Sequence, residues 1–217
     1  MRWGCLEVSG GFLLLAAFLY YMDTQGVVLW GAAACALHEG GHYLAIRLLG
    51  GRVTGLRLTC VGAEMRLSAS DPNGRAFRIL TALAGPAANL AAAAAITRWG
   101  EGMGEERYLL IGLNLSLGLF NLLPIAGLDG GRILRTLLEG GAWKRSWGQG
   151  ISLALALALG GAGIWLLLQR GNPTLLLTAG WLGILSLPEP ERGGGRGRLR
   201  RKPLQSPKKC DILPKSE

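Results

Sequence analysis

The sequence is short of charge, of histidine and of paired cysteines. Only 17% of its 217 residues are charged, and only two are histidines. A soluble domain of this size usually carries about 25% charged residues. The four cysteines are scattered and include no C-x-x-C pair, which excludes an obvious disulfide framework or zinc ribbon. Half of the residues are apolar, so the composition favours a membrane protein.

Six apolar stretches follow one another along the chain. Several are slightly shorter than the ~20 residues that cross a hydrocarbon core. Because lipid offers no partner for backbone polar groups, these stretches must be helical wherever they face it. We therefore expect an all-α membrane protein with about six transmembrane helices. The stretches cover residues 8–22, 27–49, 77–96, 108–124, 151–168 and 173–187.

The basic residues predict the orientation of these spans. If the N-terminus is cytoplasmic, 20 of the 23 Lys and Arg residues lie on the cytoplasmic side and 3 on the opposite side. An excess of Lys and Arg in cytoplasmic segments is the usual signature of membrane topology. The sequence thus predicts a multi-pass integral membrane protein with its N- and C-termini in the cytoplasm.

Composition also divides the chain into two parts. Residues 1–187 hold all six apolar stretches and are expected to form one membrane-embedded domain, with its core at 26–139. Residues 188–217 are rich in Pro, Gly and basic side chains and are expected to be a disordered cytoplasmic tail. Anchoring against anionic lipid explains the basic charge of the tail more simply than nucleic acid does. The lipid bilayer is therefore an expected partner, and nucleic acid is not.

A segment of different character, residues 52–67, separates the second and third stretches. Apolar residues alternate imperfectly with Arg, Thr and Glu, which predicts a small β-hairpin with a turn at Gly62. Two interpretations remain open for it. It is either a hairpin on the membrane surface or an exposed strand that presents an extended substrate by strand addition.

The second stretch contains the sequence His38-Glu39-Gly40-Gly41-His42, an H-E-x-x-H motif. On a helix, positions i and i+4 share one face, so both imidazoles can point at one zinc ion. Glu39 is rotated by about 100° from His38 and can take a proton from a zinc-activated water. A carboxylate and two imidazoles are costly at membrane depth, so the motif indicates a metal site.

A catalytic zinc ion needs a third protein ligand and one open position. Asp129 is the main candidate, because it follows Pro124 in a glycine-rich segment that permits an irregular backbone. By itself Asp129 fits a helix N-cap equally well. Its occurrence together with the H-E-x-x-H motif favours the ligand interpretation. Cys35, one turn before His38, is the rival ligand, although free cysteine more often serves as a small buried apolar residue.

Three motifs together closely resemble the site-2 protease family of intramembrane zinc metalloproteases, peptidase family M50. They are HEGGH, GPAAN at residues 85–89 and NLLPIAGLDGGR at residues 121–132, in the order and spacing typical of that family. The six-span layout is similar to its stage IV sporulation factor B-type branch. The resemblance implies one zinc ion per chain on His38, His42 and Asp129, with Glu39 as the acid and base.

The resemblance also implies that Asn89 and Asn121 lie near the substrate. From the residues alone, helix packing is the favoured role for Asn89, and capping of carbonyls freed by Pro124 is open for Asn121. Two departures affect the loops: Ala126-Gly127 stands where the family often has a second proline, and the hairpin lacks a Pro-Phe-Gly-Gly-like turn. The metal site is not affected by either departure.

The function expected from these features is zinc-dependent hydrolysis of peptide bonds in membrane-associated precursor proteins. By resemblance, cleavage would release a transcription factor, the location would be a bacterial cell membrane, and sporulation would be the setting. An inhibitory membrane partner is a further expected class of partner. Two alternatives stay open: a catalytically inactive zinc-binding membrane scaffold and a zinc transporter.

Overall fold

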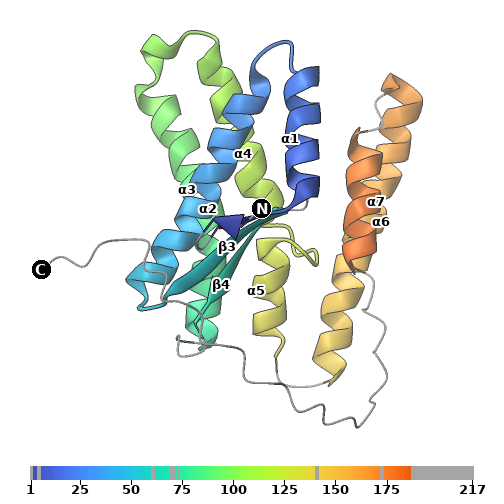
Figure 1. Ribbon diagram of the computed structural model, residues 1–217. Coiled ribbons are helices and arrows are strands. Elements are labelled where there is room, and N and C mark those ends of the chain that lie inside the picture. Colours follow the sequence, from blue (N-terminus) through green and yellow to red (C-terminus); the bar gives the residue numbers. More distant parts are fainter. Residues whose placement is uncertain are drawn as a thin grey trace, which may run out of the picture.

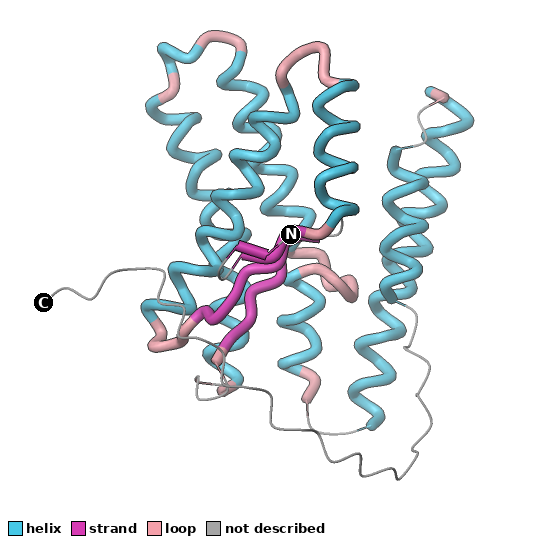
Figure 2. The backbone as a smooth tube through the Cα atoms, viewed as in Figure 1, coloured by secondary structure: helices cyan, strands magenta, loops and turns pink. Residues whose placement is uncertain are grey.

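The computed structural model describes residues 2–3, 6–59, 62–68, 72, 74–139, 142–171 and 174–186. Within these residues the chain is mostly helical and carries a small sheet (Figures 1 and 2). The tail that the sequence predicts at 188–217 lies outside the described residues. Its predicted disorder therefore stays a prediction.

Each of the six apolar stretches coincides with a helix of the structure. The short helix α5 is additional, and it follows the fourth stretch. The largest difference in bounds is at α6, which begins nine residues before the predicted stretch. The helices are α1 (Gly10–Met22), α2 (Val27–Leu48), α3 (Arg75–Trp99), α4 (Glu106–Asn121), α5 (Asp129–Leu137), α6 (Ala142–Arg170) and α7 (Thr174–Ser186), with a single 3-10 turn at Glu101–Met103.

Two of the described helical segments are long and apolar enough to cross a membrane. They are α3 and the Gly150–Arg170 part of α6, while α1 is apolar but shorter. The α2 helix has 22 residues but carries the polar HEGGH segment. The number of membrane crossings is thus not decided by helix length and hydropathy, and six spans stays a prediction.

The predicted hairpin is confirmed as the antiparallel pair β3 (Val53–Thr59) and β4 (Gly62–Leu67). Gly62 is the first residue of β4, paired with Thr59, so the turn was predicted slightly too late. Residues 60–61 lie outside the described residues.

The N-terminus extends this sheet, which the sequence did not predict. Strand β2 (Leu6–Val8) pairs in parallel with the Leu56–Leu58 part of β3, and β1 (Arg2–Trp3) pairs with β2. The strand order β1-β2-β3-β4 therefore leaves β4, and not β3, at one edge of the described sheet.

Apolar packing attaches the sheet to the helices. Ile46 of α2, Val53 of β3 and Phe77 of α3 form a buried cluster, with Tyr43 and Met65 packed against it. Ile46 lies one turn beyond His42, so this cluster holds the sheet close to the polar motif of α2.

The remaining helices fall into two groups. In Figure 1, α2, α3 and α4 stand side by side, α5 continues below α4, and α1 rises from the sheet. The α6–α7 hairpin stands on the other side of α5. A hydrogen bond from the Ser152 hydroxyl of α6 to the Pro124 carbonyl, at 3.1 Å, links this hairpin to the segment before α5.

Candidate metal centre

Helix α2 places both histidines on its buried face. His38 and His42 are 5% and 8% exposed, and their Nε2 atoms lie 3.2 Å apart. The two rings meet nearly at right angles, with centroids 4.8 Å apart. The i, i+4 spacing thus brings two imidazoles to one point, as the motif predicts.

Asp129 reaches the same point from the start of α5. Helix α4 ends at Asn121, three residues before Pro124, and α5 begins at Asp129. Leu128 is the N-cap residue and no side chain caps the helix, so the N-cap interpretation of Asp129 does not hold. A Cβ atom on Gly131 would lie 2.0 Å from the Ile125 carbonyl oxygen, so this tight return of the backbone requires glycine.

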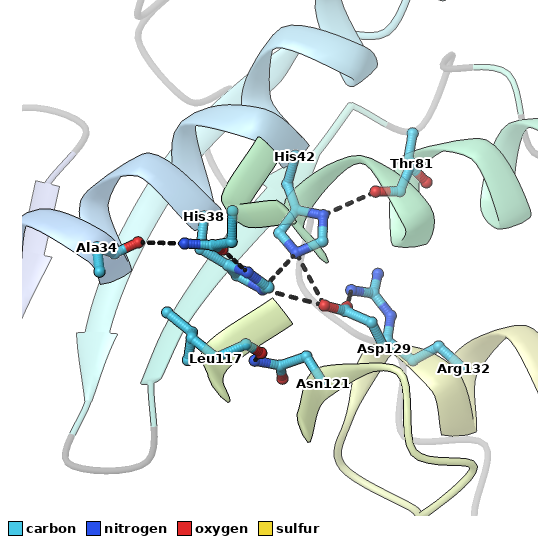
Figure 3. A network of polar contacts seen from close by, with 9 residues as sticks. Ala34, His38, His42, Thr81, Leu117, Asn121, Asp129 and Arg132 are labelled. Carbon is cyan, nitrogen blue, oxygen red and sulfur yellow. Dashed lines mark hydrogen bonds and ion pairs between the residues drawn. The ribbon is translucent and has the colours of Figure 1, made fainter. Parts of the chain in front are cut away.

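The three side chains converge on one small volume (Figure 3). Asp129 Oδ2 lies 3.1 Å from His38 Nε2 and 3.1 Å from His42 Nε2. Within the described residues, His38, His42 and Asp129 form the group whose ligand atoms could hold one metal ion. Zinc bound at about 2.0–2.2 Å keeps tetrahedral ligands about 3.3–3.6 Å apart. The observed separations are close to that range.

The opposite nitrogen of each ring has its own acceptor. His38 Nδ1 lies 2.7 Å from Asn89 Oδ1, and His42 Nδ1 lies 2.7 Å from the Thr81 carbonyl oxygen. A carbonyl oxygen can only accept, so in the neutral imidazole His42 Nδ1 carries the hydrogen and Nε2 carries the lone pair. Nitrogen lone pairs and a carboxylate oxygen packed this closely repel one another unless a cation lies between them. The residues present therefore fit a zinc ion.

Asn89 is completely buried behind His38. Besides its contact with His38, its Nδ2 atom donates to the Ala34 carbonyl at 3.1 Å and to Asn114 Oδ1 at 2.8 Å. Both amide hydrogens are used, and the residue is 0% exposed. The substrate contact expected for Asn89 does not fit this environment, whereas a place beside the site does.

The other predicted residues have more open surroundings. Glu39 is half-buried, and its carboxylate is within electrostatic range of both histidines and Asp129. Asn121 is half-buried and donates to the Leu117 carbonyl of its own helix at 3.0 Å (Figure 3). Cys35 is exposed and is not part of the metal-binding group among the described residues.

One backbone position makes room for the imidazoles. A Cβ atom on Gly85 of α3 would lie 2.3 Å from His42 Nε2 and 2.8 Å from His38 Nε2. Real Cβ atoms essentially never approach that closely, so glycine is required here. The GPAAN segment thus contributes to the site through the absence of a side chain as well as through Asn89.

Sequence reasoning missed three contributors to this site. Asn114 could have been identified from the sequence, because it is a polar residue inside an apolar stretch. Gly85 was noticed as part of a motif, but its contact with the imidazoles was not predicted. The contact of the Thr81 carbonyl with His42 could not have been predicted from the sequence, because every residue has a main-chain carbonyl.

Comparisons with known proteins point to one family. The family model described as Peptidase family M50 matches residues 99–159, which include Asp129. Two relatives are named as zinc metalloproteases: Rip3 of Mycobacterium tuberculosis, 34% identical over 139 residues, and sll0528 of Synechocystis sp., 30% identical over 151 residues. Over part of its length, the chain is therefore similar to peptidase family M50 and to these two relatives. The matches do not distinguish the branch within that family.

The extent of the matches differs between sequence and structure. The aligned regions cover 59% and 66% of this chain, but it spans only 34% of the length of Rip3 and 38% of sll0528. The solved Site-2 Protease from Methanocaldococcus jannaschii matches with a TM-score of 0.61 at 23% identity, over 88% of this chain and 96% of that chain. The chain therefore shares the fold of a site-2 protease.

Proposed function

We propose that this chain is an intramembrane zinc metalloprotease. The observation that carries the proposal is the convergence of two Nε2 atoms and a carboxylate oxygen within 3.2 Å of one another. Three protein ligands are what a catalytic zinc site supplies, since the fourth position stays open for water or substrate. A zinc ion held there would act as a Lewis acid toward water and the scissile carbonyl.

Each residue of the chain has a distinct part in this proposal. His38, His42 and Asp129 hold the ion. Glu39 takes a proton from the attacking water and then protonates the leaving amine, which is general acid–base catalysis. Asn89 orients His38, in line with its three buried hydrogen bonds. Asn121 stays the proposed contact for the substrate backbone.

The proposed substrate is a membrane-associated precursor protein that is cut within or beside the bilayer. A transmembrane helix hides its carbonyls in i to i−4 hydrogen bonds, so it must be locally extended before cleavage. An extended segment can add to a sheet edge, and β4 is such an edge in the described sheet. Because β2 partly covers β3, we propose β4 as the strand of the hairpin that docks the substrate.

Membrane location and topology complete the proposal. The membrane character of the family and the two long apolar helices indicate a membrane protein. We propose six spans, cytoplasmic termini and, within the family, the stage IV sporulation factor B-type branch. Release of a transcription factor and control by an inhibitory membrane partner are parts of the same proposal.

The decisive experiment is Glu39→Gln in the purified full-length chain. Because Glu39 serves water and is not a ligand, the variant should retain one zinc ion per chain and lose cleavage of an unfolded substrate such as casein. General acid–base groups typically contribute about 10²–10⁴-fold in rate. Wild-type protein without zinc, or a variant that cleaves at the wild-type rate, would refute the proposal.

Topology is tested separately with reporter fusions. Fusions after Met22, Gly102 and Asn172 should report the outside, and those after Gly74, Gly141 and Arg192 should report the cytoplasm. A reversed pattern would contradict the charge distribution on which this orientation depends.

A further inference from the structure

Asn114 is a buried amide that the proposed chemistry does not use. It lies inside α4 and is 3% exposed. Burying an amide is unfavourable unless its polar atoms are hydrogen-bonded. Here Nδ2 donates to the Leu110 carbonyl at 2.9 Å, and Oδ1 accepts from Asn89 Nδ2 at 2.8 Å. The side chain thus joins a main-chain carbonyl of α4 to the residue behind His38.

The main-chain carbonyls decide which way both amides are turned. A carbonyl oxygen can only accept, so Leu110 requires the NH₂ group of Asn114, whose oxygen must then face Asn89. The Ala34 carbonyl likewise requires the NH₂ group of Asn89. Both hydrogens of that group are therefore directed at Ala34 and Asn114.

The direction of these hydrogen bonds extends to the metal-binding ring. With its NH₂ group engaged, Asn89 presents Oδ1 to His38 Nδ1, at 2.7 Å. That nitrogen must donate, so the hydrogen of the neutral ring is on Nδ1 and the lone pair is on Nε2. The nitrogen that faces Asp129 and His42 is thereby the one able to bind a metal.

We propose that Asn114 is a positioning residue for the metal centre. Acting through Asn89, it selects the tautomer of His38 in which Nε2 is the free ligand atom. In His42 the Thr81 main-chain carbonyl selects the same tautomer. The hydrogen-bond chain from Asn114 through Asn89, which we call the Asn114 relay, therefore acts on His38 and not on His42. This inference rests on the proposed zinc site and extends it by one residue, Asn114.

The test is a double-mutant cycle on zinc affinity, measured by chelator competition with the full-length protein in detergent. The variants are Asn114→Leu, Asn89→Ala and the double variant. Loss of a hydrogen-bond partner of a metal ligand typically weakens binding by about 10–100-fold. We expect each single variant to lie in that range and the double variant to bind no more weakly than Asn89→Ala.

Non-additivity is the expected result because Asn114 acts only through Asn89. Losses that multiply in the double variant, or wild-type affinity in Asn114→Leu, would overturn the inference. If the wild-type protein itself binds no zinc, the proposed function fails and this inference fails with it. If only the Asn114 variants behave like wild type, the inference alone fails.

Two measurements separate positioning from general destabilisation. Thr97→Val is a matched control, since it removes a comparable bond to the carbonyl four residues earlier, 2.8 Å long and away from the metal site. It should leave zinc affinity unchanged.

If Asn114→Leu does not fold, the double-mutant cycle is run with Asn114→Ser, whose side chain is too short to reach Asn89.

The second measurement uses the fact that the chain has only two histidines. Spectra of the ¹⁵N-histidine-labelled, zinc-loaded protein therefore report each ring separately. We expect protonated Nδ1 on both rings of the wild type, and in Asn114→Leu a change in the Nδ1–H signal of His38 with that of His42 preserved. Equal changes in both rings would contradict a relay specific to His38.

Discussion

The two helical groups of this molecule bury different kinds of side chain. Besides apolar residues, the group formed by α2–α5 buries seven polar residues, five of which are linked through their side chains, whereas the described buried side chains of the α6–α7 hairpin are mainly apolar. Buried polar groups are unfavourable unless satisfied, so their concentration in one group marks where chemistry is expected. The first set is His38, His42, Thr81, Asn89, Asn114, Asp129 and Thr136, and the second is Ser152, Ala156, Ala179 and Leu182.

This difference implies that the two groups should respond differently to substitution. Changes to the buried polar residues of α2–α5, or to the backbone packed against them, should alter zinc binding, and changes in the hairpin should alter stability while zinc binding persists. The predictions below test that division, beginning with the largest effect.

Gly85→Ala should cause the largest loss. The added methyl group would overlap both imidazole rings, at 2.3 Å from His42 Nε2 and 2.8 Å from His38 Nε2. Zinc affinity should fall by more than about 100-fold, since loss of an outer hydrogen-bond partner alone costs about 10–100-fold. Gly112→Ala on α4, where a Cβ atom meets nothing within 4 Å, is the control and should bind zinc normally. Normal zinc binding by Gly85→Ala would mean that the site is assembled differently.

Asp129→Ala should lower both zinc content and cleavage, because it removes one of three proposed ligands. Cys35→Ala should change neither, since Cys35 is exposed and outside the group of ligand atoms. Metal analysis of the two purified variants checks both expectations. Loss of zinc in Cys35→Ala with retention in Asp129→Ala would reverse the ligand assignment.

Gly163→Ala tests the hairpin. A Cβ atom there would lie 2.7 Å from the backbone of Leu176, so α6 and α7 would have to separate. Overpacking of this kind costs about 1–3 kcal/mol of unfolding free energy. Thermal unfolding should show that loss, with zinc affinity unchanged. Gly161→Ala, in open space on the same helix, is the control. A large loss of zinc in Gly163→Ala would show that the hairpin supports the metal site.

Glu139→Gln should have the smallest effect. Arg78 of α3 pairs with Glu139 just after α5, and Arg75 donates to its main-chain carbonyl at 2.8 Å. The hydrogen bond from Arg78 lowers the pKa of the Glu139 carboxyl. The stabilisation is therefore complete above the ordinary carboxyl pKa and is lost as the pH falls through the lower folded-state value.

Because both side chains of the pair are partly exposed to solvent, the expected shift in thermal midpoint at neutral pH is small. The difference between wild type and Glu139→Gln should shrink as the pH is lowered. A difference that grows on acidification would contradict this assignment of the ion pair.

Local patterns were sufficient to predict the helices and the residues that converge in the candidate metal centre. An apolar stretch and an i, i+4 pair of histidines are properties of neighbouring residues, and helix geometry converts them directly into spatial positions. Pro124 and the glycines after it indicated the break between α4 and α5 for the same reason, because their backbone preferences are local.

Contacts between distant segments were not predictable in this way. The pairing of β2 with β3 joins residues about fifty positions apart, and three N-terminal residues are too few to show strand periodicity. This pairing matters for substrate docking, because β2 covers part of the β3 edge that an isolated hairpin would leave open.

By itself, the sequence determined that this protein is largely helical and that α2 carries two imidazoles on one face. It also limited a third ligand to Asp, Glu or Cys, because no further histidine is available. Only the tertiary structure decided which nitrogen of each ring faces Asp129 and which faces its own hydrogen-bond partner. That depends on the Thr81 carbonyl and on the amides of Asn89 and Asn114, which come from other helices and meet the histidines only when α2, α3 and α4 pack together.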